Sequence, residues 1–517
     1  MQHRVEMPAT FSFRNCWSGH TTFVGYIYQR LSSMCYGMQK QIVYLHTSKM
    51  AKYNLGIDIG TTSVKVCIVN LSTNEVEAQH VKDTQSNIPS DTGHSGNKQD
   101  VFKIISTLNL CVSKLPKHLL QEVEAIGVCG QMHGVVFWKN DATQKAWEII
   151  EKDTTIRYDV VPERVSNLYT WQDNRCDSAF LDRLPKPQSH LNIASGFGCA
   201  TMFWMKKHKP EKLKKYNCSG TISDFAVAML CNMNKPMMSY QNAASWGYFN
   251  CATKQWNKEV LQQADFPVNL LPEVGQSGAI AGSLAGDWHS IPKGTPVGIG
   301  LGDLQCSVLS TVERSTDAVL NISTSAQITF VVDQYQPSSG PPKASAVDHF
   351  PYFGHQYIAV AASLNGGNAL ATFVKMLQQW TLELGFNVPQ SKVWEKLLSI
   401  SLEDTAVSDL QVRPTCLGER HSPDRTASVS NIHVGNLHLA QVFRALCKGL
   451  VENMRSMMPR EILQEAKIDR IVGNGSGLSR NKVLQAEVQQ QYLLPLVFTK
   501  GGDSAKGAAI AFSQKEE

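Results

Sequence analysis

The sequence predicts an α/β protein in which two halves, each built on its own sheet, face a shared cleft. A β-hairpin pattern with a hydroxyl-rich tip occurs twice, about 263 residues apart. Between the two hairpins, a third strand pattern ends on an aspartate. The length of 517 residues is sufficient for two domains of ordinary size, each with a substantial core.

The first hairpin is predicted by the stretch NLGIDIGTTSVKVCIV at residues 54–69. Apolar residues alternate with period two on both sides of Gly60, Thr61 and Thr62, which is typical of two strands joined by a turn. Asp58 lies near the end of the first strand. Backbone N–H groups and hydroxyls that converge at such a tip suit a phosphate group. An ordinary hydroxyl-rich turn is the alternative.

The second hairpin is predicted by the stretch DAVLNISTSAQITFVV at residues 317–332. When the two stretches are aligned, Asn321 matches Asp58, Ser323 matches Gly60, and Thr324 matches the residue that follows Gly60. Two tips of the same kind in two halves of one chain favour a pair of phosphate-binding turns. This interpretation requires both tips to face one cavity.

The stretch PVGIGLGDLQCSVLS at residues 296–310 predicts a glycine-rich strand that ends on Asp303 and is followed by a helix. An aspartate in this place is typical either of a helix N-cap or of an active-site base. Together with Asp58 it would bring two carboxylates close to the two tips. Carboxylate oxygens near phosphate groups suit Mg²⁺, which keeps part of its hydration shell.

Three polar segments predict a site for a neutral, polyhydroxylated substrate. They are GQMHG at residues 130–134, TWQDNR at 170–175 and QNAASW at 241–246, and they combine aromatic rings with many neutral donors and acceptors. A structural role for the histidine, and a surface turn with an ion pair for TWQDNR, are the alternatives. The candidate substrate contacts are Gln131, Met132, His133, Trp171, Asp173, Arg175 and Asn242.

One further segment suggests a nucleotide contact. No Gly-Lys dipeptide occurs in the chain, which excludes a Walker A loop. The segment GNGSG at residues 473–477 follows a strand pattern and precedes a stretch of helical character, but Leu478 stands where a dinucleotide fingerprint has its third glycine. The segment therefore predicts either a contact to the base or ribose of a nucleotide or a simple strand-to-helix turn.

The net charge of +5 does not indicate a nucleic-acid partner, because it is unevenly placed. Residues 1–52 contain six Lys or Arg and one acid, and the rest of the chain has 43 residues of each sign. No apolar run approaches the roughly 18–20 residues that span a bilayer. The 13 cysteines include no C-x-x-C pair, which favours free thiols in the cytoplasm over a zinc or disulfide framework.

Residues 1–52 are expected to form an N-terminal extension outside the folded domains. A basic segment with a single acid is compatible with a transit peptide. Met50 stands directly before the first strand pattern, which favours a non-native extension over residues 1–49.

Several motifs together resemble the FGGY family of carbohydrate kinases. They are GIDIGTTSVK, GQMHG, TWQDNR, GLGDLQ, NISTS, SLNGGN, LGERH and GNGSGLSRN, and the resemblance covers about residues 53–513. It implies two ribonuclease-H-like lobes of the actin/hexokinase/Hsp70 type with a central cleft. The expected lobes are 53–313, which binds sugar, phosphate and metal, and 314–517, which binds the nucleotide.

The resemblance also implies an activity and its residues. The expected reaction transfers the γ-phosphoryl group of ATP, with Mg²⁺, to the terminal hydroxyl of sedoheptulose, a step that feeds the pentose phosphate pathway. Asp303 matches the catalytic base, Asp58 and Asp303 match the metal site, and the substrate contacts are those given above. The residues expected to contact ATP are Gly60, Thr61, Thr62, Lys65, Ser323, Thr324, Gly366, Gly475, Ser476 and Asn481.

Other functions on the same fold remain open at this stage. Many relatives have glycine where this chain has Ser323, which leaves a backbone contact at that position unsettled. Xylulose or another ketose or polyol is the alternative substrate within the family. A non-catalytic sugar sensor or an Hsp70-like ATPase is the alternative of another class. The chain is expected to be a monomer or homodimer that binds neither nucleic acid nor membrane.

Overall fold

The computed structural model describes residues 53–512, with gaps at 142, 153–154, 341, 343–344, 404–407 and 423. The described residues all belong to one compact unit. The expected N-terminal extension over residues 1–52 lies outside the described residues. Within the described part of the chain, no helix is both long and apolar enough to cross a membrane.

The first sheet contains the first predicted hairpin. Its strand order is β16-β17-β6-β1-β2-β3. Strand β18 also pairs with β6, at the carboxyl end of β6 and after the residue with which β17 pairs. Strands β1, β2 and β3 are antiparallel neighbours, whereas β6 runs parallel to β1, and β17 runs parallel to β6. The bounds are β1 Tyr53–Ile59, β2 Ser63–Asn70, β3 Glu75–Asp83, β6 Val123–Gly130, β16 Ile280–Ser283, β17 Pro296–Gly298 and β18 Leu301–Gly302.

The second sheet repeats this arrangement, in the order β21-β22-β20-β19-β25-β26. Strand β19 has an antiparallel partner, β20, on one side and a parallel partner, β25, on the other, as β1 has β2 and β6. The predicted internal repeat is therefore confirmed as a repeat of sheet topology. The bounds are β19 Asp317–Ile322, β20 Ala326–Val332, β21 Asp348–Pro351, β22 Tyr357–Ser363, β25 Arg470–Asn474 and β26 Leu496–Val497.

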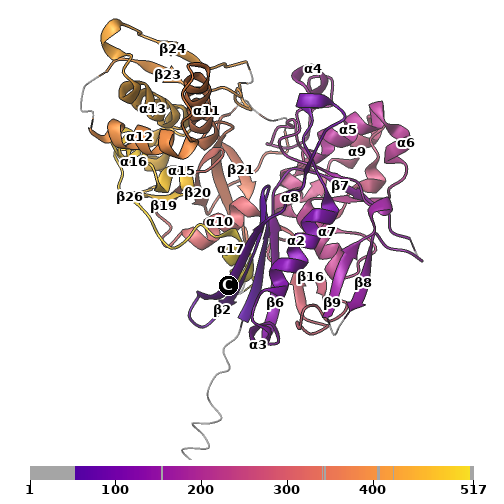
Figure 1. Cartoon of the computed structure of the whole chain (residues 1–517). Helices are drawn as coiled ribbons and strands as arrows, with labels where there is room; N and C mark the ends of the chain where they lie inside the picture. Colours follow the sequence, from indigo (N-terminus) through magenta and orange to yellow (C-terminus); the bar gives the residue numbers. More distant parts are fainter. Residues whose placement is uncertain are drawn as a thin grey trace, which may run out of the picture. The chain divides into compact units, whose positions relative to one another are not determined.

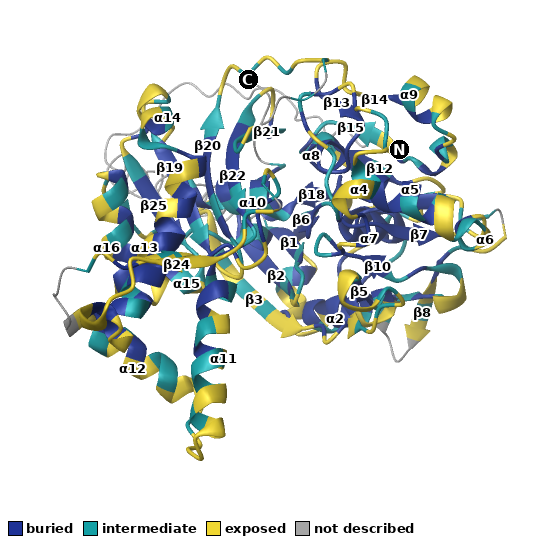
Figure 2. Ribbon diagram, turned by 90° about the horizontal axis from the view of Figure 1, so that it is seen from above, coloured by how far each residue is buried: buried dark blue, intermediate teal, exposed yellow. Residues whose placement is uncertain are grey.

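Helices cover both sheets because the alternating apolar residues of the strands must be buried (Figure 1). The core of the first sheet includes residues of α2 (Val101–Ser113) and α7 (Ile222–Leu230). The core of the second sheet includes residues of α11 (Gly367–Glu383), α12 (Gln390–Glu403), α13 (Leu439–Met457) and α16 (Lys482–Tyr492). In Figure 2 the strands of both sheets are largely dark blue (buried), whereas the outer faces of the helices are yellow (exposed).

A third core belongs to the long segment inserted between β6 and β17. It gathers aromatic and apolar side chains, among them Phe137, Tyr169, Trp246 and Phe249. The segment supplies one wall of the site described below. The remaining strands and helices are β4 Asn87–Ile88, β5 Lys98–Gln99, α3 Lys117–Leu120, β7 Val136–Trp138, β8 Trp147–Lys152, β9 Thr155–Val160, β10 Leu168–Tyr169, α4 Ser178–Leu181, α5 Gly198–His208, α6 Pro210–Leu213, β11 Cys218–Gly220, β12 Met237–Ser239, α8 Tyr240–Ala244, β13 Phe249–Asn250, β14 Gln255–Trp256, α9 Lys258–Gln263, β15 Glu273–Gly275, β23 Gln411–Arg413, β24 Ser428–Ser430, α14 Arg460–Glu465 and α15 Ser476–Ser479.

Two helices connect the sheets, α10 (Asp303–Thr311) and α17 (Ser504–Ile510). They contact each other, and α17 also contacts β1, β2 and β6 although it comes near the end of the chain. Glycine permits this approach: a Cβ on Gly56 would lie 1.9 Å from the carbonyl oxygen of Ala505, and a Cβ on Gly127 would lie 2.0 Å from that of Ala508. The segment expected to end the second lobe therefore packs on the first sheet.

Candidate active site

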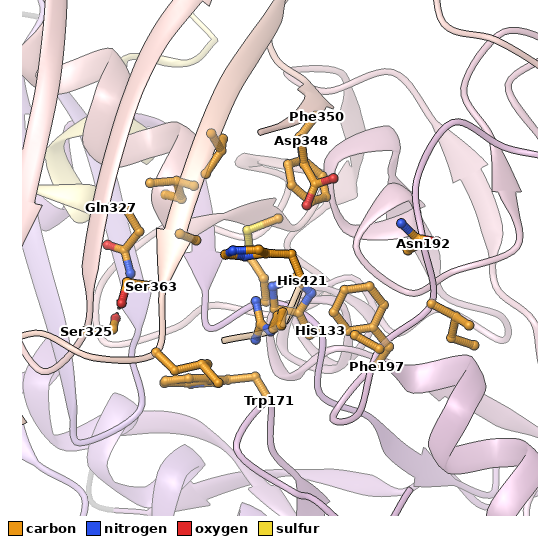
Figure 3. A pocket seen from close by; sticks show the side chains of 18 of the residues that line it. His133, Trp171, Asn192, Phe197, Ser325, Gln327, Asp348, Phe350, Ser363 and His421 are labelled. Carbon is orange, nitrogen blue, oxygen red and sulfur yellow. Dashed lines mark hydrogen bonds between the residues drawn. The ribbon is translucent and has the colours of Figure 1, made fainter. Parts of the chain in front are cut away.

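One cavity of about 690 Å³ is lined by residues from both sheets (Figure 3). Both hairpin tips reach it, through Thr61 on one side and Ser323 with Thr324 on the other. The expectation that the two tips face one cavity is therefore confirmed. The candidate residues that line it are Thr61, Met132, His133, Trp171, Asp303, Ser323 and Thr324.

The first tip is held by hydrogen bonds that fix its backbone. The N–H of Gly60 donates to the carbonyl of Ser63 at 3.0 Å, and the Gln99 side chain donates to the carbonyl of Thr61 at 2.6 Å. The indole N–H of Trp171 donates to the Thr61 hydroxyl at 3.0 Å. Thr62 is exposed and lies outside the cavity lining, while its carbonyl accepts from a neighbouring loop.

The second tip is held by two glycine segments that approach it closely. A Cβ on Gly366 would lie 2.4 Å from the carbonyl carbon of Ser325. Gly475, with a φ of +85°, approaches from the other side, where a Cβ would lie 2.6 Å from the Ser323 hydroxyl. Neither glycine lines the cavity, so in this structure both shape the tip from behind. The N–H of Gly367 also donates to the carbonyl of Ser323 at 2.8 Å.

A buried carboxylate anchors the segment that supports the second tip. Glu419 is 1% exposed and accepts four hydrogen bonds: from the Ser363 hydroxyl at 2.6 Å, the Leu364 N–H at 3.1 Å, and the side-chain amides of Asn365 at 3.1 Å and Asn453 at 2.7 Å. Residues 363–365 lead directly into the glycines that contact the tip. Through these hydrogen bonds, Glu419 joins α13 and β22 to the segment that positions the second tip.

Three carboxylates lie near the point where the sheets meet. Asp303 is the first residue of α10, and its side chain lines the cavity and accepts from the N–H of Leu304 at 2.7 Å without forming an N-cap. Burial raises the pKa of Asp303 to about 6. Burial, together with the negative charges of Asp303 and Asp503, raises the pKa of Asp58 to about 8.

Lys65 does not face the cavity in this structure. It lies opposite Asp58 in the first hairpin, and its ammonium group forms an ion pair with Asp503 at 2.7 Å. Asp503 is also the N-cap of α17, where it accepts from the N–H groups of Ala505 and Lys506. The ion pair therefore joins the first hairpin to the start of α17.

His133 and its neighbours form an aromatic wall of the cavity. The His133 ring stacks on Phe197 with centroids 4.5 Å apart and an interplanar angle of 9°. Its Nδ1 lies 2.8 Å from the carbonyl of Ser245, so Nδ1 carries the proton and Nε2 is an acceptor. Burial, and the charge of Arg420, lower the pKa of His133 to about 3, which keeps the ring neutral. A neutral ring with a free acceptor suits a hydroxyl group.

Four other candidate substrate contacts lie behind the cavity lining. Asp173 and Arg175 form a buried bidentate ion pair, with Nε–Oδ1 at 2.6 Å and Nη2–Oδ2 at 2.8 Å, so TWQDNR contains an ion pair but not a surface turn. The Asn242 side chain donates to the carbonyl of Gly300 at 3.1 Å and supports the loop before Asp303. The Gln131 side chain donates to Gln99 at 2.9 Å, behind the first tip.

The candidate nucleotide residues near the end of the chain divide into two kinds. Ser476 is exposed and begins the short helix α15 next to the second tip. Asn481 is 3% exposed and is the N-cap of α16, because its side-chain oxygen Oδ1 accepts from the N–H groups of Val483 at 3.0 Å and Leu484 at 3.2 Å. Its amide group donates to Cys447, so Asn481 is engaged within the fold.

The sequence reasoning missed three charged residues around the site. Asp503 stands before the small-residue run that forms α17, and Arg420 belongs to the quoted LGERH motif, but neither was given a role. Asp348 begins β21 and lines the cavity with Arg420. A polar residue before a small-residue helix is a recognisable N-cap signal for Asp503, whereas no local pattern distinguishes Arg420 or Asp348.

The carboxylates fit a divalent cation by their chemistry. Among the described residues, no group of three or more His, Cys, Asp or Glu side chains is placed so that it could hold a metal ion. Burial, and repulsion from Asp303 and Asp503, raise the pKa of Asp58; a bound cation would offset the repulsion, and carboxylate oxygens are ligands that Mg²⁺ prefers. Asp58 and Asp303 are the residues that would hold it, with water and phosphate oxygens completing the shell.

Comparison with known proteins assigns the family. The sequence profile of the FGGY family of carbohydrate kinases, N-terminal domain, matches residues 53–310. A sedoheptulokinase of Mus musculus is 47% identical over 469 residues, which cover 89% of this chain and 97% of that protein. The chain belongs to the FGGY family of carbohydrate kinases. It is therefore an ATP-dependent sugar kinase.

More distant proteins show how far the fold of this FGGY kinase extends. A xylulose kinase of Bacillus subtilis is 23% identical, covering 89% of this chain and 87% of that protein. The solved structure of a gluconate kinase from Lactobacillus acidophilus matches with a TM-score of 0.70 at 19% identity, covering 90% of each chain. The predicted two-lobed α/β fold of the actin/hexokinase type is thus confirmed.

Proposed function

We propose that this FGGY kinase transfers the γ-phosphoryl group of ATP to the terminal hydroxyl of sedoheptulose and releases sedoheptulose 7-phosphate and ADP. The observation that carries the proposal is the 47% identity to the mouse sedoheptulokinase along nearly its full length. The product would enter the pentose phosphate pathway. A cavity with a neutral histidine acceptor and aromatic walls is suited to an uncharged sugar.

In the proposed mechanism, Asp303 accepts the proton of the attacking hydroxyl. A carboxyl with a pKa of about 6 is mostly ionised at neutral pH and is a stronger base than an ordinary aspartate. Phosphoryl transfer otherwise depends on positioning and on charge stabilisation around the phosphoryl oxygens. The N–H groups and hydroxyls of the two tips would supply that stabilisation. Bound Mg²⁺ would neutralise part of the phosphate charge.

The two lobes divide these tasks. We assign residues 53–313 to sugar, phosphate and metal binding, and residues 314–517 to nucleotide binding. The second tip with Gly366, Gly475 and Ser476 would surround the phosphates and the adenosine. Lys65 and Asn481 are engaged within the fold in this structure. They would affect nucleotide binding by holding the first hairpin and α16 in place. Closure of the lobes would exclude water, which competes as a phosphoryl acceptor.

The cysteines bear on the compartment. The cysteines of the described residues are free, and most of them are buried, which supports a reducing compartment such as the cytoplasm. For the assembly state we propose a monomer or a homodimer.

A panel of four ketoses and glycerol tests the proposed function. Initial rates of ADP release are measured with ATP, Mg²⁺ and sedoheptulose, xylulose, ribulose, fructose or glycerol, and kcat/KM is compared. We expect sedoheptulose to give the highest value by at least tenfold. A higher value for xylulose would assign the protein to that substrate instead. Sugar binding without ADP release from any compound would indicate a sensor.

A further inference from the structure

Two partly buried charged side chains in the cavity lining have no role in the mechanism above. Arg420 lies in the loop that follows the buried Glu419, and Asp348 is the first residue of β21. Both are partly buried and both line the cavity (Figure 3 shows Asp348). Each charge stabilises the other, yet among the described residues neither side chain forms a hydrogen bond or an ion pair within 4.0 Å. The charges are near each other but not in contact.

The guanidinium group of Arg420 lies near the aromatic wall formed by His133 and Phe197. Its central carbon is 5.8 Å from the centroid of the Phe197 ring, and that ring stacks on His133. The charge of Arg420 also acts on His133. Phe197 and His133 belong to the part of the chain before the second sheet, whereas Arg420 is held through Glu419 to β22 and α13. Arg420 thus reaches across the cavity to the aromatic wall of His133 and Phe197.

The physical cost of this arrangement points to a ligand. A partly buried guanidinium and a partly buried carboxylate each lose hydration, and the loss is compensated only when hydrogen-bond partners replace the water. A sugar hydroxyl both donates and accepts, so neighbouring hydroxyls satisfy a carboxylate and a guanidinium at the same time. An anionic ligand would be attracted by Arg420 but repelled by Asp348. The pair therefore favours a neutral polyol.

We propose that Arg420 and Asp348 form a two-part binding site for ketose hydroxyls other than the one that is phosphorylated. Arg420 donates to hydroxyl oxygens and Asp348 accepts from hydroxyl protons. The pair selects neutral ketoses against sugar acids of similar length, and through Arg420 the bound sugar contacts the part of the chain that carries the second tip. The inference rests on the proposed function, because it takes this cavity as the sugar site.

Steady-state kinetics of four variants test the inference, with KM for the ketose and KM for ATP measured separately. We expect Arg420→Ala to raise the ketose KM about 10- to 100-fold, as for loss of a charged hydrogen bond, with the ATP KM within about twofold. Arg420→Lys should restore part of the affinity, and Asp348→Asn should raise the ketose KM about tenfold. Arg413→Ala is the matched control, because Arg413 is exposed on β23 outside the cavity lining and should behave as wild type.

Selectivity separates direct recognition from a structural effect. Asp348→Asn removes the carboxylate that repels acids, so the ratio of kcat/KM for a six- or seven-carbon aldonate to that for the ketose should rise at least tenfold. A misfolded or loosened variant would lose both activities together, and thermal melting of each variant identifies such a loss. If Arg420→Ala does not fold, Arg420→Lys and Asp348→Asn carry the test.

Three results would overturn the inference: a ketose KM unchanged in both Arg420→Ala and Asp348→Asn, an ATP KM that rises as much as the ketose KM, or an aldonate ratio that does not change. The wild-type ketose panel keeps this inference distinct from the proposed function. If wild type prefers another ketose, sedoheptulose is the wrong substrate, and the Arg420 and Asp348 variants are compared on the preferred ketose with the same criteria.

Discussion

Replacement of Glu419 by glutamine tests whether a buried network outside the cavity positions the second tip. Glu419 accepts four hydrogen bonds, and one of its oxygens, Oε1, accepts three of them. Glutamine with its carbonyl in the place of Oε1 keeps those three acceptor contacts. Its amide group then meets the N–H of Leu364, so that two donors face each other without an acceptor.

The expected loss of stability follows from that single mismatch. A hydrogen bond to a charged group contributes about 1.5–3 kcal/mol, and an unsatisfied buried donor costs about 1–3 kcal/mol. These two figures describe partly the same energy, so they are not added in full. We therefore expect Glu419→Gln to lower the free energy of unfolding by about 2–3 kcal/mol. Because residues 363–365 lead into the glycines behind the second tip, the KM for ATP should rise at least fivefold.

Chemical denaturation and steady-state kinetics measure these two effects. Glu313→Gln is the matched control, because Glu313 is an exposed partner of Arg470 and exposed ion pairs contribute little. A Glu419→Gln protein with wild-type stability and wild-type KM for ATP would refute the reasoning. Loss of stability with an unchanged KM for ATP would show that the network supports the fold but does not position the tip.

Three further predictions follow from the geometry of single residues. Asp303→Asn should lower kcat at least 100-fold with the ketose KM within about threefold, as measured by ADP release, because it removes a general base. In the folded protein the pKa of His133 is about 3, below the usual 6.5, so the unfolded chain gains the proton first as pH falls. The stability that His133 contributes should therefore be about 2 kcal/mol smaller at pH 5 than at pH 7.5. Chemical denaturation measures this effect, because the difference in free energy of unfolding between wild type and His133→Gln should be smaller at pH 5. Gly56→Ala should destabilise the protein by about 1–3 kcal/mol because its Cβ would overlap the carbonyl of Ala505, whereas Gly286→Ala, with no atom closer than 3.7 Å, is the control that keeps wild-type stability.

The hairpins were predictable because their evidence is local. Leu55, Ile57 and Ile59 alternate along β1, and all three are fully buried. The same period, repeated in β19 and β20, specified the second sheet. Asp303 was predicted at the start of a helix after a strand, and α10 begins there. Alternation and turn composition are properties of a few consecutive residues, so the sequence displays them directly.

The remaining site features depend on contacts between distant segments. Asp173 looked available for a sugar hydroxyl, but Arg175, two residues away, pairs with it in the interior. Lys65 looked available for a phosphate, but α17, more than 400 residues later, brings Asp503 within 2.7 Å of it. Arg420 reaches the aromatic wall of His133 and Phe197 only because the second half of the chain folds across from the first. No local pattern encodes such pairings.

Identification of the phosphorylated product tests the central claim most directly. The protein is incubated with ATP, Mg²⁺ and sedoheptulose, and the position of the new phosphate is determined by phosphorus–carbon coupling in NMR spectra, with Asp303→Asn in parallel. The account predicts a phosphate on C7 in the wild-type reaction and, when both reactions are sampled during the initial-rate period, at least 100-fold less product with the variant. A phosphate at another carbon, or equal product from Asp303→Asn, would contradict it.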